Sequence, residues 1–136
     1  MRFALALFLA GCAAPRMAAQ SMVTNVPDLV RMDPVGPAPA KITMLHGDDV
    51  HTCNVVQVRA SVKAHVHRKS HEIVCVLSGE GRLTLGDKEM RVAPGDVVFV
   101  ARGTVHAFES TGAEPAVVLS VFTPRFVDGD RIFVQD

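Results

Sequence analysis

The sequence contains no tryptophan and no tyrosine, and it carries no net charge. Without tyrosine, no phenol can act as a general acid, and only phenylalanine could stack on a nucleic-acid base. Lysine plus arginine and aspartate plus glutamate number 14 each, whereas nucleic-acid-binding domains normally show a basic excess. The composition therefore excludes tyrosine-based catalysis, and we expect no nucleic-acid partner.

Long apolar runs are also lacking, and the one compact run has the features of an export signal. Arg2 precedes apolar residues 3–10, which are too few to span a bilayer but suit a signal-peptide core. The run ends in LAGC, residues 9–12, which is similar to the lipobox of bacterial lipoproteins. We expect residues 1–12 to be a signal ending at a lipidated Cys12, so that the protein is a periplasmic lipoprotein held to the membrane only by this lipid anchor. The alternative is an ordinary secretion signal cleaved at GCAA or MAA, which also exports the protein.

Residues 13–40 contain five of the eight prolines and much alanine. Proline removes a backbone donor and disfavours helices and central strands alike. The stretch DPVGPAPA in particular indicates an extended linker. We interpret residues 13–40 as a tether, with the alternative that residues 22–32 form an arm lying on the domain or on a second subunit.

From Lys41 the pattern changes to short apolar runs that are each closed by a turn signal. The runs are KITMLH, TCNVVQVRA, EIVCVLSG, GRLTLG, MRVAPG, VVFVARG, VHAFES and AVVLSVF. Glycine and Pro-Gly separate them at hairpin spacing, and no segment keeps a helical period for three turns. This pattern predicts an all-β fold, in which residues 41–136 close a small barrel with a ligand cavity at one mouth.

Half of the six histidines lie within the stretch AHVHRKSHE. His65 and His67 are two residues apart on a predicted strand, so their rings leave the same face. Glu72 opens the next strand, and His106 opens a later one. Three imidazoles and one carboxylate form a mixed nitrogen and oxygen donor set that suits a divalent first-row metal. These four residues are our candidate metal ligands.

Two motifs around these residues resemble those of the cupin superfamily. The first combines His-x-His with a later glutamate and glycine, and the second runs from Gly-Asp to a histidine. The matching residues are His65, His67, Glu72 and Gly79, then Gly95, Asp96, Gly103 and His106. The departures are Ala60-Ser61 for Pro-Gly, Ala101 for proline and Ser110 for asparagine, and these positions shape turns rather than bind metal.

The resemblance covers residues 41–126 and implies a cupin barrel, the double-stranded β-helix or jelly-roll-like fold, with a metal inside. It implies Mn, Fe, Ni, Cu or Zn as the cofactor and a small-molecule ligand or substrate. It favours a metal-dependent enzyme of the oxygenase, lyase or isomerase type that acts on a small organic or sugar acid. The alternative is a non-catalytic module that binds a small molecule or sugar at the membrane surface, because cupins host many functions.

Strand alternation does not decide between Glu72 and the adjacent His71, because both faces of HEIVCVLS are apolar. Family spacing favours Glu72 as the ligand, with His71 pointing away. Lys63 lies on the same strand face as His65 and His67 and could reach an anionic substrate, or it could be an exposed lysine at the end of the strand. Phe108 shares the face of His106 and could line the cavity.

Other side chains are expected to be structural. His46 and His51 flank an acidic turn and are interpreted as exposed polar residues, while Phe99 and Phe122 are expected in the core with Phe108. Cys53 and Cys75 could form a disulfide in an exported protein, or each could be a small buried residue in its strand. An open barrel leaves strand edges to cover, so we expect a homodimer.

Overall fold

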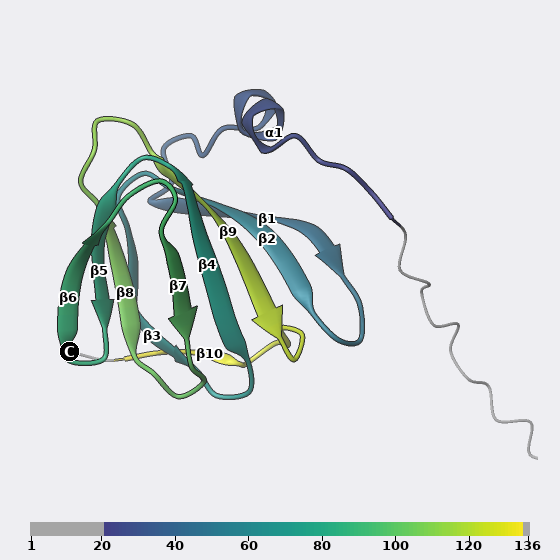
Figure 1. The fold of residues 1–136 in the computed structure, drawn as a ribbon, viewed down its shortest axis with the longest axis vertical. Helices are drawn as coiled ribbons and strands as arrows, with labels where there is room; N and C mark the ends of the chain where they lie inside the picture. The colour runs from purple at the N-terminus through teal and green to yellow at the C-terminus, as the bar shows by residue number, and fades with distance from the viewer. Residues whose placement is uncertain (1–20, 135–136) are drawn as a thin grey trace, which may run out of the picture.

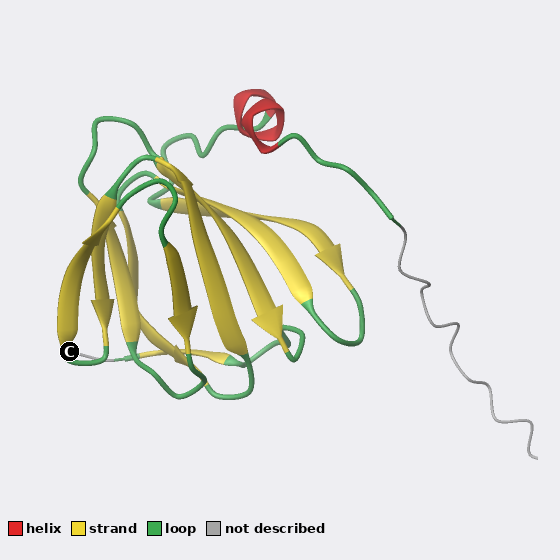
Figure 2. Ribbon diagram, in the orientation of Figure 1, coloured by secondary structure: helices red, strands yellow, loops and turns green. Residues whose placement is uncertain are grey.

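The computed structural model describes residues 21–134, which form one short helix and ten β-strands (Figure 1, Figure 2). The elements are α1 (Val26–Met32), β1 (Ala40–Gly47), β2 (Thr52–Val58), β3 (Ser61–His67), β4 (His71–Ser78), β5 (Gly81–Leu85), β6 (Lys88–Val92), β7 (Val97–Val100), β8 (His106–Ser110), β9 (Ala116–Thr123) and β10 (Arg131–Phe133). The predicted all-β fold is confirmed. The expected export signal and Cys12 lie outside the described residues.

The strands form two five-stranded sheets. Sheet A has the order β1-β2-β9-β4-β7, and sheet B has the order β10-β3-β8-β5-β6. All neighbouring strands within each sheet are antiparallel. Because the chain crosses repeatedly between the sheets, residues far apart in the sequence meet between them (Figure 1).

Buried apolar side chains from both sheets form a hydrophobic cluster. Val76 and Val118 of sheet A lie in this buried cluster with Leu83 and Val92 of sheet B, and Phe108 packs against it. Phe122 is also buried, as expected, but Phe99 is 59% exposed on β7 and does not belong to the core. Alternation explains the difference, since Phe99 pairs with Ile73, whose side chain is also exposed.

The proline-rich segment before β1 contains a helix and packs on the barrel, which composition alone did not predict. The Asn25 side chain accepts the Asp28 N–H at 2.9 Å and caps α1, while Pro27 sits in the first turn, where proline costs nothing. After the helix, the Asp33 carbonyl accepts from the Gln57 side chain at 2.9 Å, and Val35 is buried. Residues 33–39 therefore form an arm on the chain's own barrel, whereas α1, which lies within the arm expected as an alternative for residues 22–32, has no buried residue.

Cys53 and Cys75 are both free. Cys53 lies on β2 and Cys75 on β4, and β9 runs between these two strands. Because neighbouring strands lie about 4.8 Å apart, the Cα atoms of the two cysteines are separated by about 10 Å or more. A disulfide tolerates a Cα separation of no more than about 7 Å. The alternative of a Cys53–Cys75 disulfide is therefore wrong, and both cysteines are half-buried strand residues. Within the described residues, no helix is long and apolar enough to cross a membrane.

Candidate metal centre

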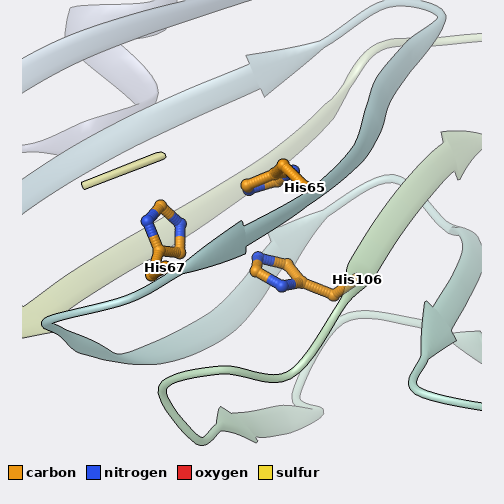
Figure 3. A group of neighbouring side chains, drawn as sticks. All are labelled: His65, His67 and His106. Carbon is orange, nitrogen blue, oxygen red and sulfur yellow. The ribbon is translucent and has the colours of Figure 1, made fainter. Parts of the chain in front are cut away.

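Three histidines of sheet B point into the space between the sheets (Figure 3). His65 and His67 lie on β3, where alternation places both side chains on the same face. His106 is the first residue of β8 and pairs directly with His65. The ladder between β3 and β8 shifts register between Val62 and His65, just before this pair. All three side chains are buried.

The rings of the three histidines lie close together, and each offers a nitrogen to the same region. One nitrogen from each of His65, His67 and His106 lies within 4.8 Å of the others. The ring centroids of His65 and His106 are 4.1 Å apart, and that of His67 is 5.0 Å from His65 and 5.3 Å from His106. This arrangement matches three ligands on one face of a metal ion.

Backbone carbonyls fix the tautomer of two of these rings. The Nδ1 of His65 lies 2.7 Å from the Lys63 carbonyl, and the Nδ1 of His106 lies 2.9 Å from the Thr104 carbonyl. A carbonyl can only accept, so each Nδ1 must carry the proton and donate it. In the neutral form of each ring the Nε2 then keeps its lone pair, which is the form that binds a metal.

Glu72 reaches the same point from the opposite sheet. It lies on β4 of sheet A, and its Oε2 is 3.3 Å from the His106 Nε2 and 3.7 Å from the His67 Nε2. Its other oxygen accepts a hydrogen bond from the Ser120 hydroxyl at 2.5 Å. Burial raises the pKa of Glu72, but its contacts with His106 and Ser120 lower this pKa by more, so the carboxyl is ionised at neutral pH.

His67 faces a second buried carboxylate on its other side. The Nδ1 of His67 lies 3.6 Å from Asp130 Oδ2, and Asp130 is fully buried in the loop before β10. Asp130 Oδ1 accepts the Lys69 N–H at 2.6 Å. Burial raises the pKa of Asp130, but the hydrogen bonds from Lys69 and Ser70 lower it by more. An anionic Asp130 favours a proton on the His67 Nδ1, which again leaves Nε2 free.

These residues fit a divalent transition metal. The Nε2 atoms of His67 and His106 are buried and have no hydrogen-bond partner. Both atoms face the Glu72 carboxylate, and either a proton on an imidazole or a metal cation in this position would stabilise the ionised carboxylate. Burial lowers the pKa of His65 to about 4 and also lowers the pKa of His67, so both rings are neutral at pH 7. Neutral imidazoles and one carboxylate are the donors such an ion requires.

A cavity of about 340 Å³ extends from this cluster between the two sheets. Most of its lining residues are aliphatic or aromatic, and its polar end carries His65, Glu72, His106, Ser120 and Arg131. Val56, Val74, Val98, Phe108 and Val118 are among the apolar lining residues. A largely apolar cavity with a few polar groups at one end is typical of a small-molecule site.

Arg131 brings a positive charge to the polar end. It pairs directly with His67 across β10 and β3, so its side chain leaves the same face as the histidine. Arg131 lines the cavity and stacks over the Phe126 ring at 5.7 Å. Its Nε is buried without a hydrogen-bond partner among the described residues.

The structure brings the four candidate metal ligands together, namely His65, His67, Glu72 and His106. The His71 side chain points outward, where it accepts the Arg102 N–H at 3.1 Å and stacks on Phe99. Lys63 and Phe108 both line the cavity, and Lys63 is exposed at its rim. His46 and His51 are half-buried rather than exposed, and they flank Asp48 in the β1–β2 hairpin.

Sequence reasoning missed Ser120, Asp130 and Arg131. Ser120 had a signal, because it is the one polar residue inside the apolar run AVVLSVF. Asp130 and Arg131 had none, since they lie in a polar tail that gives no indication of its position beside His67.

Comparison with known proteins places the chain in a family. Residues 54–122, half of the chain, match the family described as the Cupin domain. The chain belongs to the cupin family. The match contains all four candidate ligands of this cupin but not Asp130 or Arg131.

This cupin is 30% identical over 81 residues to an uncharacterized protein of Aquifex aeolicus, a match that covers 60% of the chain and 66% of that protein. It is also similar to the crystal structure of TT1209 from Thermus thermophilus, with a TM-score of 0.66 and 27% identity over 73% of this chain and 96% of the other. The nucleoside dehydratase Pac13 of Streptomyces shares the fold, with a TM-score of 0.62 and 21% identity over 71% of this chain and 79% of the other.

Proposed function

We propose that this cupin is a metal-dependent enzyme of the oxygenase, lyase or isomerase type that acts on a small organic or sugar acid. The observation that carries this proposal is the meeting of three buried imidazoles and one carboxylate at the polar end of an apolar cavity. Buried polar atoms without partners are costly, so their presence here indicates a site kept for binding.

His65, His67, Glu72 and His106 would hold a divalent transition metal, Mn, Fe, Ni, Cu or Zn. When bound, such an ion supplies Lewis acidity to a carboxylate or enolate of the substrate. The chain's own residues orient the ligands, through the Lys63 and Thr104 carbonyls and the Ser120 hydroxyl. These contacts fix the ligand side chains before the ion arrives.

The charges at the site favour an anionic substrate. Glu72 and Asp130 would balance the two charges of the ion, and Arg131 would then leave one positive charge in a buried region. An anionic ligand group would neutralise that charge and satisfy the free Arg131 Nε. The aliphatic wall would contact the rest of the molecule and exclude water. Together these features support a carboxylate as the group bound beside the metal.

The similarity to Pac13 supports an enzymatic role. Pac13 is a nucleoside dehydratase, and variants of it are known with uridine. A barrel of this shape can therefore hold a small molecule and catalyse a reaction.

Elemental analysis tests the proposal. Protein purified without a histidine tag should carry a stoichiometric transition metal, and His67→Ala and His106→Ala should each lose the metal from the cavity. A screen of carboxylic and sugar acids on the loaded protein then separates turnover from simple binding. A loaded protein that binds acids without converting them would be the non-catalytic binding module. A wild-type protein without metal would overturn the proposal.

We also propose that the chain is exported and anchored through a lipid on Cys12, as the LAGC sequence suggests. Cys12→Ser should then release the protein from the membrane fraction into the soluble extracytoplasmic fraction. Wild-type protein that partitions into buffer without detergent would contradict the anchor.

A homodimer is proposed as the assembly. The outer face of sheet A exposes large apolar side chains next to the edge strand β7, namely Ile73, Leu77, Val97 and Phe99, with exposures of 41–67%. A second copy packed on this face would cover them and the strand edge. Light scattering should give the mass of two chains for the wild type and of one chain for Phe99→Asp. Equal masses for both would contradict this interface.

A further inference from the structure

The hairpin between β1 and β2 carries a second group of potential metal ligands, away from the histidines of the cavity. His46 pairs with Cys53 near the end of β1, Asp48 lies in the turn, and His51 directly precedes β2. One ligand atom from each lies within 4.8 Å of the others, and all three side chains are half-buried. The group shares no residue with the cavity site.

The spacing of these atoms suits a small divalent ion. The His46 Nε2 is 3.5 Å from Asp48 Oδ2, and the His51 Nδ1 is 3.3 Å from Asp48 Oδ1. In a tetrahedral zinc site with bonds of about 2.0–2.1 Å, neighbouring ligand atoms lie about 3.3 Å apart. The two imidazole rings are 5.2 Å apart and inclined by 37°, so both can face one point.

The backbone holds the Asp48 carboxylate in place and ionised. Asp48 Oδ1 accepts the Val50 and His51 N–H groups at 2.8 Å each, and the Asp48 N–H donates to the His51 carbonyl at 3.0 Å. The backbone N–H groups of His51 and Val50 lower the pKa of Asp48 to about 2. A rigid hairpin thus presents a permanent carboxylate between two imidazoles, with Oδ2 left for a ligand.

We propose that His46, Asp48 and His51 form a second metal site, which binds a divalent transition ion such as Zn²⁺. Two nitrogens and one carboxylate oxygen would coordinate the ion, and solvent would complete the shell. This site goes beyond the function proposed above, because it would bind metal whether or not the cavity does.

A bound ion would also stiffen the wall of the barrel mouth. Asp48 lines a second cavity of about 620 Å³. Asn54, Phe122 and Arg131 line both this cavity and the one beside the histidines. Fixing the hairpin would therefore fix part of the wall of a cavity that adjoins the histidine site.

The test counts zinc ions. The full chain is stripped of metal with a chelator and titrated with Zn²⁺ by calorimetry. The same titration is done on the Glu72→Gln/His106→Ala double variant, in which the cavity site is disabled. In that chain one Zn²⁺ should still bind, and adding His46→Gln and His51→Gln should abolish it. The matched control adds His71→Gln to the double variant instead of the two hairpin changes. Because His71 belongs to neither group of ligands, this control should still bind the Zn²⁺ ion.

A nuclear magnetic resonance readout does not depend on the variants. Zn²⁺ should shift the imidazole nitrogens of His46 and His51 in the wild-type chain and leave those of His71 unchanged. Unmoved His46 and His51 signals, or a zinc count that survives both hairpin changes, would overturn the second site. The cavity site and its function would stand in either case, because their own variants report on them.

Discussion

At the scale of single residues, Glu72 and His71 show how one position along a strand decides chemistry. Adjacent on β4, they point to opposite faces of sheet A. Glu72 lies 3.3 Å from the His106 Nε2, while His71 stacks on the exposed Phe99. A shift of one residue would bury the imidazole and expose the carboxylate.

Glu72→Gln keeps the size of the side chain but removes its charge, so it should weaken metal binding in the cavity by about 10-fold or more. His71→Gln should leave the affinity unchanged. Competition with a chromophoric chelator measures both. Because His46 and His51 form a cluster of their own, both variants are compared in a chain carrying His46→Gln and His51→Gln. Metal loss in His71→Gln with none in Glu72→Gln would reverse the assignment of faces.

Arg131 is expected to bind the carboxylate of the substrate. Benzoate is a suitable probe because it joins a carboxylate to an apolar body, and benzamide is its neutral counterpart. Arg131→Gln should weaken benzoate binding to the metal-loaded protein by about 10- to 100-fold and leave benzamide unaffected. Lys63→Gln removes a rim charge and is the matched control. Equal benzoate affinities in wild type and Arg131→Gln, measured by calorimetry, would contradict this role.

The buried His65 makes stability depend on pH in the metal-free protein. Burial and the neighbouring His106 hold the pKa of His65 at about 4, whereas an unfolded histidine titrates near 6.5. Between these values the unfolded chain takes up a proton that the folded chain refuses, so stability is complete above pH 6.5 and falls toward pH 4. The loss is at most about 3 kcal/mol. Urea unfolding of chelated protein across this range measures it, and His65→Gln should flatten the curve.

At the scale of elements, the arm before β1 contributes to stability. Val35 is buried against the barrel, whereas Val23 is fully exposed. Val35→Ala should lower the free energy of unfolding by about 1–2 kcal/mol, while Val23→Ala should change it by less than about 0.5 kcal/mol. Equal losses in urea unfolding would mean that the arm does not pack as the structure shows.

The strands could be predicted from the sequence because local signals define them. Short apolar runs alternate with turns, and Gly79, Gly86 and Gly95 adopt the positive φ that such turns require. Helix α1 could not be predicted, since its seven residues lie among prolines and its cap is a single asparagine. An arm is an alternative that the sequence offers for residues 22–32, but the contacts of residues 33–39 could not be predicted, because they reach residues more than twenty positions away.

At the scale of the whole molecule, the site exists only because two sheets face each other. The four candidate ligands could be found from their motif, since its spacing is local on each strand. Asp130 and Arg131 could not, because the pairing of β10 with β3 brings them to His67 from the end of the chain. No local pattern encodes that pairing, which depends on closure of the barrel.

An anomalous-difference map from crystals of protein purified without added metal would test the metal site between the sheets. A peak should lie about 2.0–2.3 Å from the Nε2 atoms of His65, His67 and His106 and from an oxygen of Glu72. A map with no peak at this position would contradict this site, even if a peak occurred in the β1–β2 hairpin.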